Sequence, residues 1–121
     1  MKKLILFSFF ALYLGSCTYK YTEPTIPPDP NETVSFSGQI IPIWNSTNVC
    51  DGCHAPGATS PDLSAANAYN EIMTKNLVDT ADAANSEIYK HPGSGLHTHT
   101  KYTTTEAALV LLWIEQGAIN N

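Results

Sequence analysis

The sequence predicts a small all-α domain of three to four helices, and three observations predict it. After residue 34, apolar residues recur at the three- and four-residue spacing of a helix face in separate segments. Serine, threonine and acidic residues stand where helix N-caps are needed. No segment shows the alternating apolar and polar pattern of a half-buried strand. We expect the folded domain to span residues 34–121.

The first helix is expected to begin at Ser35 or Ser37, because serine is a preferred N-cap. Pro42 disturbs this helix, since proline lacks the N–H that an inner helical turn uses. The apolar residues with mainly helical spacing are Phe36, Ile40, Ile41, Ile43 and Trp44. The helix would lead directly into residues 50–54.

The second helix is expected from Ala65 to about Lys75, with Asp62 or Ser64 as its cap. Its buried stripe would consist of Ala68, Tyr69, Ile72 and Met73.

A short third helical turn would open at Ser86 and be stopped by His91-Pro92-Gly93. The last helix has the clearest limits. Thr103 and Glu106 form a capping box, the residues from 107 to 114 are strongly apolar, and Gly117 provides a C-terminal stop.

Cys50-Asp51-Gly52-Cys53-His54 has the form C-x-x-C-H, the attachment signature of a c-type haem. Two thiols at this spacing can each add to one vinyl group of a porphyrin, while the next imidazole reaches the iron from that face. The motif therefore predicts one covalent haem c, held by Cys50 and Cys53 with His54 as the proximal iron ligand.

Other meanings of C-x-x-C are less well supported. A thioredoxin-like redox pair needs a βαβ setting, and no run of strands precedes Cys50. A structural zinc site needs four ligands, and no second pair follows at finger spacing. A plain disulfide between Cys50 and Cys53 is the simplest alternative, in an oxidising compartment.

Residues 1–16 have the basic start and short apolar run of a secretory signal peptide. Leu14-Gly15-Ser16-Cys17 resembles a bacterial lipobox, which predicts lipid on Cys17 as the first mature residue. Three acyl chains would anchor the chain firmly to the cell envelope. Thr18 favours the outer membrane by analogy, with the domain in the periplasm or at the cell surface. An ordinary signal peptide beside an unrelated cysteine is the alternative.

Residues 17–33 contain four prolines within seven residues and predict an extended, lipidated tether. With Cys17 taking lipid and Cys50 and Cys53 taking haem, all three cysteines have a role.

The chain has a formal net charge of −5 and no arginine. A nucleic-acid partner is therefore excluded, because phosphate contacts need a basic patch. An acidic surface would steer the domain toward a redox protein with a basic docking patch. The alternative is that the net charge only keeps the domain soluble.

The domain resembles the small monohaem class I cytochrome c domains of bacterial membrane-anchored proteins. The haem motif is the specific part, and four further segments follow the family order. They are Phe36 with Ile40-Ile41-Pro42-Ile43, Asp62-Leu63-Ser64, Ser86-Glu87-Ile88-Tyr89 and Trp113-Ile114-Glu115-Gln116-Gly117-Ala118.

The resemblance implies a cytochrome c-like fold around one haem, in which the first and last helices cross. Phe36 or Ile40 would then pack against Leu112 and Trp113. The residues expected to pack at the haem pocket are Phe36, Ile40, Leu96 and Trp113. By analogy, His54 would donate its other ring hydrogen to the carbonyl of Pro56 or Pro61.

The sixth iron ligand in this family is usually a methionine, and Leu96 occupies its place here. We favour His97, one residue away, as the distal ligand. His99 is the alternative, because residues two apart in an extended loop point to the same face. Met73 is less favoured, since it lies in a helical apolar stripe. His91 beside Pro92 is expected at the turn surface, and it or a five-coordinate iron remains a further option.

The function predicted from these features is a membrane-anchored c-type cytochrome that carries single electrons and is not an enzyme. Histidine ligation would give a lower potential than methionine ligation. The alternative is a haem-based sensor or small-ligand-binding module with an open or labile sixth position. A peroxidase-like enzyme is disfavoured because the chain has no arginine. A haem-free lipoprotein adaptor with a Cys50–Cys53 disulfide completes the alternatives.

Overall fold

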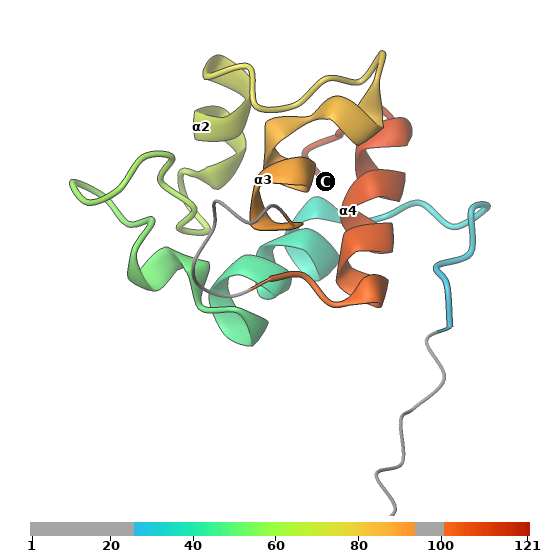
Figure 1. Ribbon diagram of the computed structural model, residues 1–121, viewed down its shortest axis with the longest axis horizontal. Coiled ribbons are helices and arrows are strands. Elements are labelled where there is room, and N and C mark those ends of the chain that lie inside the picture. The colour runs from blue at the N-terminus through green and yellow to red at the C-terminus, as the bar shows by residue number, and fades with distance from the viewer. Residues whose placement is uncertain (1–25, 94–100) are drawn as a thin grey trace, which may run out of the picture.

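The computed structural model describes residues 26–93 and 101–121, and these form a small all-helical domain of four helices without strands. Figure 1 shows α3 beside α4 within it. The first helix combines two π-helices, η2 (Phe36–Ile40) and η3 (Ile43–Thr47). The others are α2 (Ala68–Thr74), α3 (Glu87–Gly93) and α4 (Thr104–Glu115). Two short 3₁₀ turns, η4 (Cys50–Gly52) and η5 (Ala83–Asn85), complete the described elements. The predicted all-α class is confirmed.

The first helix begins at Ser35, whose hydroxyl accepts the N–H of Gly38 at 3.1 Å. Its turns are π-helical on both sides of Pro42. The amide of Ile41 therefore reaches back five residues to the carbonyl of Phe36. Because proline has no N–H to donate in the α-helical pattern, a wider turn beside it is a reasonable local solution. The expected disturbance at Pro42 is a change of helix type, without a break in the helix.

The second helix begins later than predicted, at Ala68 instead of Ala65. Asp62 does not cap it. One carboxylate oxygen of Asp62 accepts the backbone N–H of Ser64 at 2.9 Å, and the other accepts the side-chain amide of Asn67 at 2.6 Å. These bonds stabilise the turn that precedes α2. Within α2, Ala68 and Ile72 are buried, as the apolar stripe predicted.

The third helix does not stop at His91, as the sequence suggested, but continues through Pro92 to Gly93. Pro92 cannot donate to the carbonyl of Ile88, four residues earlier. The hydroxyl of Tyr102 donates to that carbonyl instead, at 3.1 Å. The Tyr102 side chain, from a later segment, thus supplies the hydrogen bond that Pro92 cannot make. α3 continues about one turn further than the sequence predicted.

The last helix has the predicted ends. Glu106 N–H donates to the Thr103 hydroxyl at 3.3 Å, and Thr103 N–H donates to the Glu106 carboxylate at 2.7 Å. Gly117 adopts a φ of +96°, and Ala118 N–H bonds the carbonyl of Trp113 at 2.9 Å. This is a Schellman C-cap, for which glycine is suited because it has no Cβ.

The core joins the first helix to α4. The ring of Phe36 lies 5.1 Å from that of Trp113 between centroids and 5.9 Å from that of Trp44. Asn121 adds polar bonds to the same junction, since its side-chain oxygen accepts the N–H of Phe36 at 2.7 Å. The predicted packing of Phe36 against Trp113 is confirmed. Among the described residues, no helix has both the length and the apolar character needed to cross a membrane.

Candidate functional site

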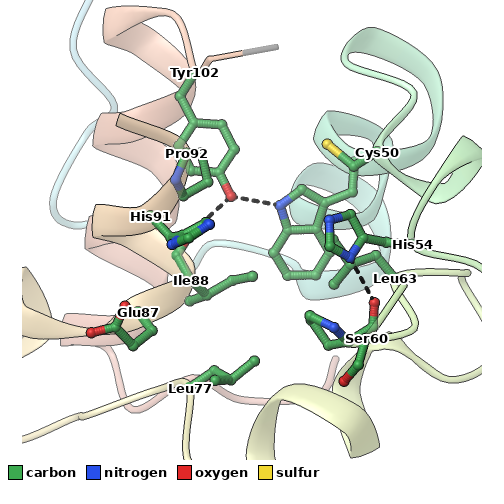
Figure 2. Close-up of a pocket in the computed structure, with 12 residues that line it drawn as sticks. Cys50, His54, Ser60, Leu63, Leu77, Glu87, Ile88, His91, Pro92 and Tyr102 are labelled. Atoms are coloured by element: carbon green, nitrogen blue, oxygen red, sulfur yellow. Dashed lines mark hydrogen bonds between the residues drawn. The ribbon is translucent and has the colours of Figure 1, made fainter. Parts of the chain in front are cut away.

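A cavity of about 250 Å³ lies beside the C-x-x-C-H motif. Two sets of residues face each other across it, as Figure 2 shows. We name the first the His54 wall: Cys50, His54, Ser60, Pro61 and Leu63. We name the second the His91 wall: Leu77, Glu87, Ile88, His91 and Pro92. Trp44 and Tyr102 line the remainder. Most of these side chains are apolar, so the cavity suits an apolar ligand.

The turn η4 places Cys50 and His54 at the same cavity. His54 N–H donates to the carbonyl of Cys50 at 2.8 Å, and Cys53 N–H donates to the same carbonyl at 3.1 Å. Cys50 is half-buried and lines the cavity, whereas Cys53 is exposed and does not. Both thiols are free, so the two cysteines are not joined in a disulfide.

Burial raises the pKa of the Cys50 thiol above its ordinary value, and the nearby carboxylate of Asp51 raises it further. A nucleophilic redox cysteine needs the opposite, a lowered pKa that yields thiolate at neutral pH. The electrostatics of Cys50 therefore do not favour a thioredoxin-like function.

The ring of His54 is fixed by a hydrogen bond. Its Nδ1 lies 3.0 Å from the carbonyl oxygen of Pro61 (Figure 2). A carbonyl can only accept, so Nδ1 carries the proton and Nε2 carries the lone pair that can bind a metal. The loop is held closed because Leu63 N–H donates to the carbonyl of His54 at 2.7 Å. Of the two carbonyls proposed from the sequence, Pro61 is confirmed as the partner.

Val49 precedes the motif in a strained conformation. Its φ is +50°, in the left-handed region that β-branched residues seldom adopt. Its side chain is 59% exposed, so burial offsets little of this strain. The conformation ends the first helix and turns the chain into η4. Strain of this kind costs about 1–3 kcal/mol.

Trp44 and Tyr102 connect the two walls by hydrogen bonds. The indole N–H of Trp44 donates to the Tyr102 hydroxyl at 2.8 Å, and that hydroxyl donates to the carbonyl of Ile88. Burial raises the pKa of Tyr102 well above its ordinary value, and the hydrogen bond from Trp44 opposes this only in part. The phenol therefore stays protonated and keeps donating to α3 at neutral pH.

His91 is exposed, as expected, and it also lines the cavity, which was not expected. The α3 residues that line the cavity are Glu87, Ile88, His91 and Pro92. Their spacing is that of one helix face. Because the helix continues past His91, this side chain joins Ile88 on the face toward the cavity, although it is also exposed to solvent. Figure 2 shows it across the cavity from His54.

Several residues predicted for the pocket lie elsewhere. Phe36, Ile40 and Trp113 are fully buried core residues that do not line the cavity, and Trp44 is the cavity residue from the first helix. Met73 packs against the core from α2, also away from the cavity lining. The remaining predicted residues lie outside the described part of the chain: Cys17, Leu96, His97 and His99.

Sequence reasoning missed the role of Trp44, Leu77, Ile88 and Tyr102 as cavity residues. The sequence contains one signal that could have identified two of them, Ile88 and Tyr102. Pro92 lies four residues after Ile88, so a helix through both leaves a carbonyl without its usual donor. Tyr102, just before the capping box of α4, is the side chain that reaches it.

Comparison with family models, with curated proteins and with solved structures finds no match to this chain. Within residues 26–93 and 101–121, no group of three or more His, Cys, Asp or Glu side chains could hold a metal ion by itself. The site must therefore be interpreted from its own residues.

Proposed function

We propose that this chain is a c-type cytochrome with a small cytochrome c-like fold, which carries single electrons on one covalently attached haem c. The observation that carries the proposal is the setting of the C-x-x-C-H motif. Cys50 and His54 line one apolar cavity, and the hydrogen bond from His54 to Pro61 leaves Nε2 as the metal-binding nitrogen. Such a fixed tautomer is what an iron-ligating histidine needs.

The residues present fit this cofactor. Cys50 and Cys53 would form the two thioether bonds, and His54 would ligate the iron. Leu63, Leu77 and Ile88 line the cavity and would provide apolar contacts to the porphyrin.

When bound, the haem would supply a one-electron couple between ferric and ferrous iron. The chain contributes orientation and polarity. Pro61 holds the imidazole of His54, and Trp44 with Tyr102 holds the opposite wall. We assign no acid, base or nucleophile to a reaction, and the chain is proposed as a carrier rather than an enzyme. His97 remains the histidine that the sequence favours as distal ligand, with His99 as its alternative.

We also propose that the domain is exported and lipid-anchored through Cys17, after removal of residues 1–16, with residues 17–33 as tether. Two hydrogen bonds of one side chain support a domain start near residue 34. The side chain of Gln116 accepts the N–H of Val34 at 2.9 Å and donates to the carbonyl of Glu32 at 2.8 Å. The proposed place is the outer membrane, facing the periplasm or the cell surface. An acidic surface suits a redox partner with a basic patch.

The test is a potentiometric titration of the protein expressed with c-type maturation machinery. We expect sharp α and β bands on reduction and a reversible one-electron transition. His54→Ala should shift or abolish this transition, whereas Lys75→Ala, an exposed change at the end of α2, should not. A high-spin haem that binds carbon monoxide in the wild type would favour the sensor, and a chain without haem would contradict both functions.

A further inference from the structure

We propose that His91 would bind the haem iron as its second protein ligand, together with His54. This inference rests on the haem-binding function proposed above. It replaces the sequence-based choice of His97 with a histidine that the described structure brings to the cavity.

The position of His91 is the first argument. α3 turns one face toward the cavity, and Ile88 and His91, three residues apart, share it. The cavity has His54 on one side and His91 on the other (Figure 2). Two imidazoles on opposite sides of one apolar cavity are the arrangement that a bis-histidine haem requires.

The second argument is that α3 is anchored at Ile88, which shares the cavity face with His91. Ile88 N–H donates to the carbonyl of Leu77 at 3.1 Å. Ile88 C=O accepts from the Tyr102 hydroxyl, which in turn accepts from Trp44. Both backbone groups of Ile88 are thus fixed to other parts of the domain. His91 lies less than one turn further along the same face, so its side chain starts from an anchored backbone.

The third argument concerns the other cavity groups that could bind iron. Cys50 would already be consumed by the thioether bond. The carboxylate of Glu87 lies 3.3 Å from the ammonium of Lys90, in an exposed ion pair. The hydroxyl of Tyr102 donates its proton to the carbonyl of Ile88 and accepts the indole N–H of Trp44. Beyond His54, His91 is the cavity residue that offers an imidazole, the more suitable ligand for iron in a closed electron carrier.

The test is electron paramagnetic resonance and magnetic circular dichroism of the ferric holoprotein. The variants are His91→Ala, His97→Ala and His99→Ala, with Lys90→Ala as a control on the same helix. We expect a low-spin wild type. Only His91→Ala should become high-spin and bind carbon monoxide when reduced, and added imidazole should restore its low-spin spectrum.

A low-spin His91→Ala protein would overturn the inference, as would a high-spin wild type. A second variant guards against misfolding. His91→Met should remain low-spin and gain a near-infrared band from methionine sulfur to ferric iron, and the absence of that band in a helical protein also overturns the inference. Failure of the proposed function is distinguishable, because the denatured wild type would then carry no haem absorbance.

Discussion

The two walls of the cavity are built in different ways. The His54 wall comes from one short stretch between residues 50 and 63, and local hydrogen bonds hold it. His54 bonds Cys50 and Leu63 through its backbone and Pro61 through its ring. The His91 wall combines Leu77 with residues of α3. It depends on Tyr102 and Trp44, which come from distant parts of the chain.

This difference separates the proposed attachment and first iron ligand from the proposed second iron ligand. The His54 wall carries Cys50, one of the two residues proposed to attach the haem, and the proposed ligand His54, and their geometry depends mainly on neighbours in sequence. The His91 wall carries the proposed second ligand, and its geometry depends on tertiary contacts. Changes at Trp44 or Tyr102 should therefore affect stability and the His91 wall while the motif keeps its local form.

The largest effect is expected from Trp44→Ala. Trp44 is fully buried and contributes to both the core and the cavity. Removing its ring should lower the free energy of unfolding by about 3–5 kcal/mol, measured by chemical denaturation. Trp44→Phe keeps most of the ring packing and loses the bond to Tyr102, so its cost should be smaller. Equal costs for the two variants would show that packing is not the main contribution.

Tyr102→Phe should lower the free energy of unfolding by about 1–3 kcal/mol, because it leaves Ile88 C=O and Trp44 N–H without their partner. The same substitution at Tyr69, whose hydroxyl donates to Ala118 at 3.1 Å, is the matched control away from the cavity. Hydrogen exchange should then increase in α3 for Tyr102→Phe and not for Tyr69→Phe.

A double-mutant cycle with Pro92→Ala sharpens this prediction. Alanine at this position would supply an N–H to Ile88 C=O, so Tyr102→Phe should cost less in that background. An unchanged cost would mean that Tyr102 does not replace the missing proline donor.

The pH dependence of stability should also depend on Tyr102. Its pKa is raised in the folded protein, so the unfolded chain loses this proton first as pH rises. The contribution of Tyr102 to the free energy of unfolding is fully present below the ordinary tyrosine pKa of about 10. Above that pH it is lost, at up to about 1.4 kcal/mol per pH unit. Urea denaturation should be measured between about pH 8 and pH 11, a range that spans the ordinary tyrosine pKa. The free energy of unfolding should decline less with pH for Tyr102→Phe than for the wild type. Parallel declines would contradict the assignment.

The smallest effect is expected at Val49, beside the His54 wall. Val49→Asn should raise the free energy of unfolding by about 1 kcal/mol, because asparagine tolerates a positive φ better than a β-branched residue. Ile119→Asn is a suitable control, since Ile119 is similarly exposed and has no positive φ. If both substitutions change stability equally, strain at Val49 is not the cause.

The sequence could predict the local features because each has a short-range cause. Ser35, the Thr103–Glu106 box and Gly117 end their helices through groups within a few residues. The partner of the His54 ring was expected only by analogy, as Pro56 or Pro61, and the bond to Pro61 spans seven residues.

Features that depend on distant residues were not predictable in the same way. Pro92 indicates a helix stop in the sequence, and only the fold brings Tyr102 to the carbonyl of Ile88. With that contact in place α3 continues through His91, which lines the cavity while staying exposed. The late start of α2 has a different, local origin, because Asp62 is engaged by Ser64 and Asn67 before the helix begins.

The most direct test of the central claim is the intact mass of the denatured protein after expression with c-type maturation machinery. The double variant Cys50→Ser, Cys53→Ser is its control. We predict that the wild-type chain carries the added mass of one haem, which survives denaturation, and that the double variant does not. A wild-type chain of unmodified mass, with Cys50 and Cys53 still open to alkylation, would contradict the account.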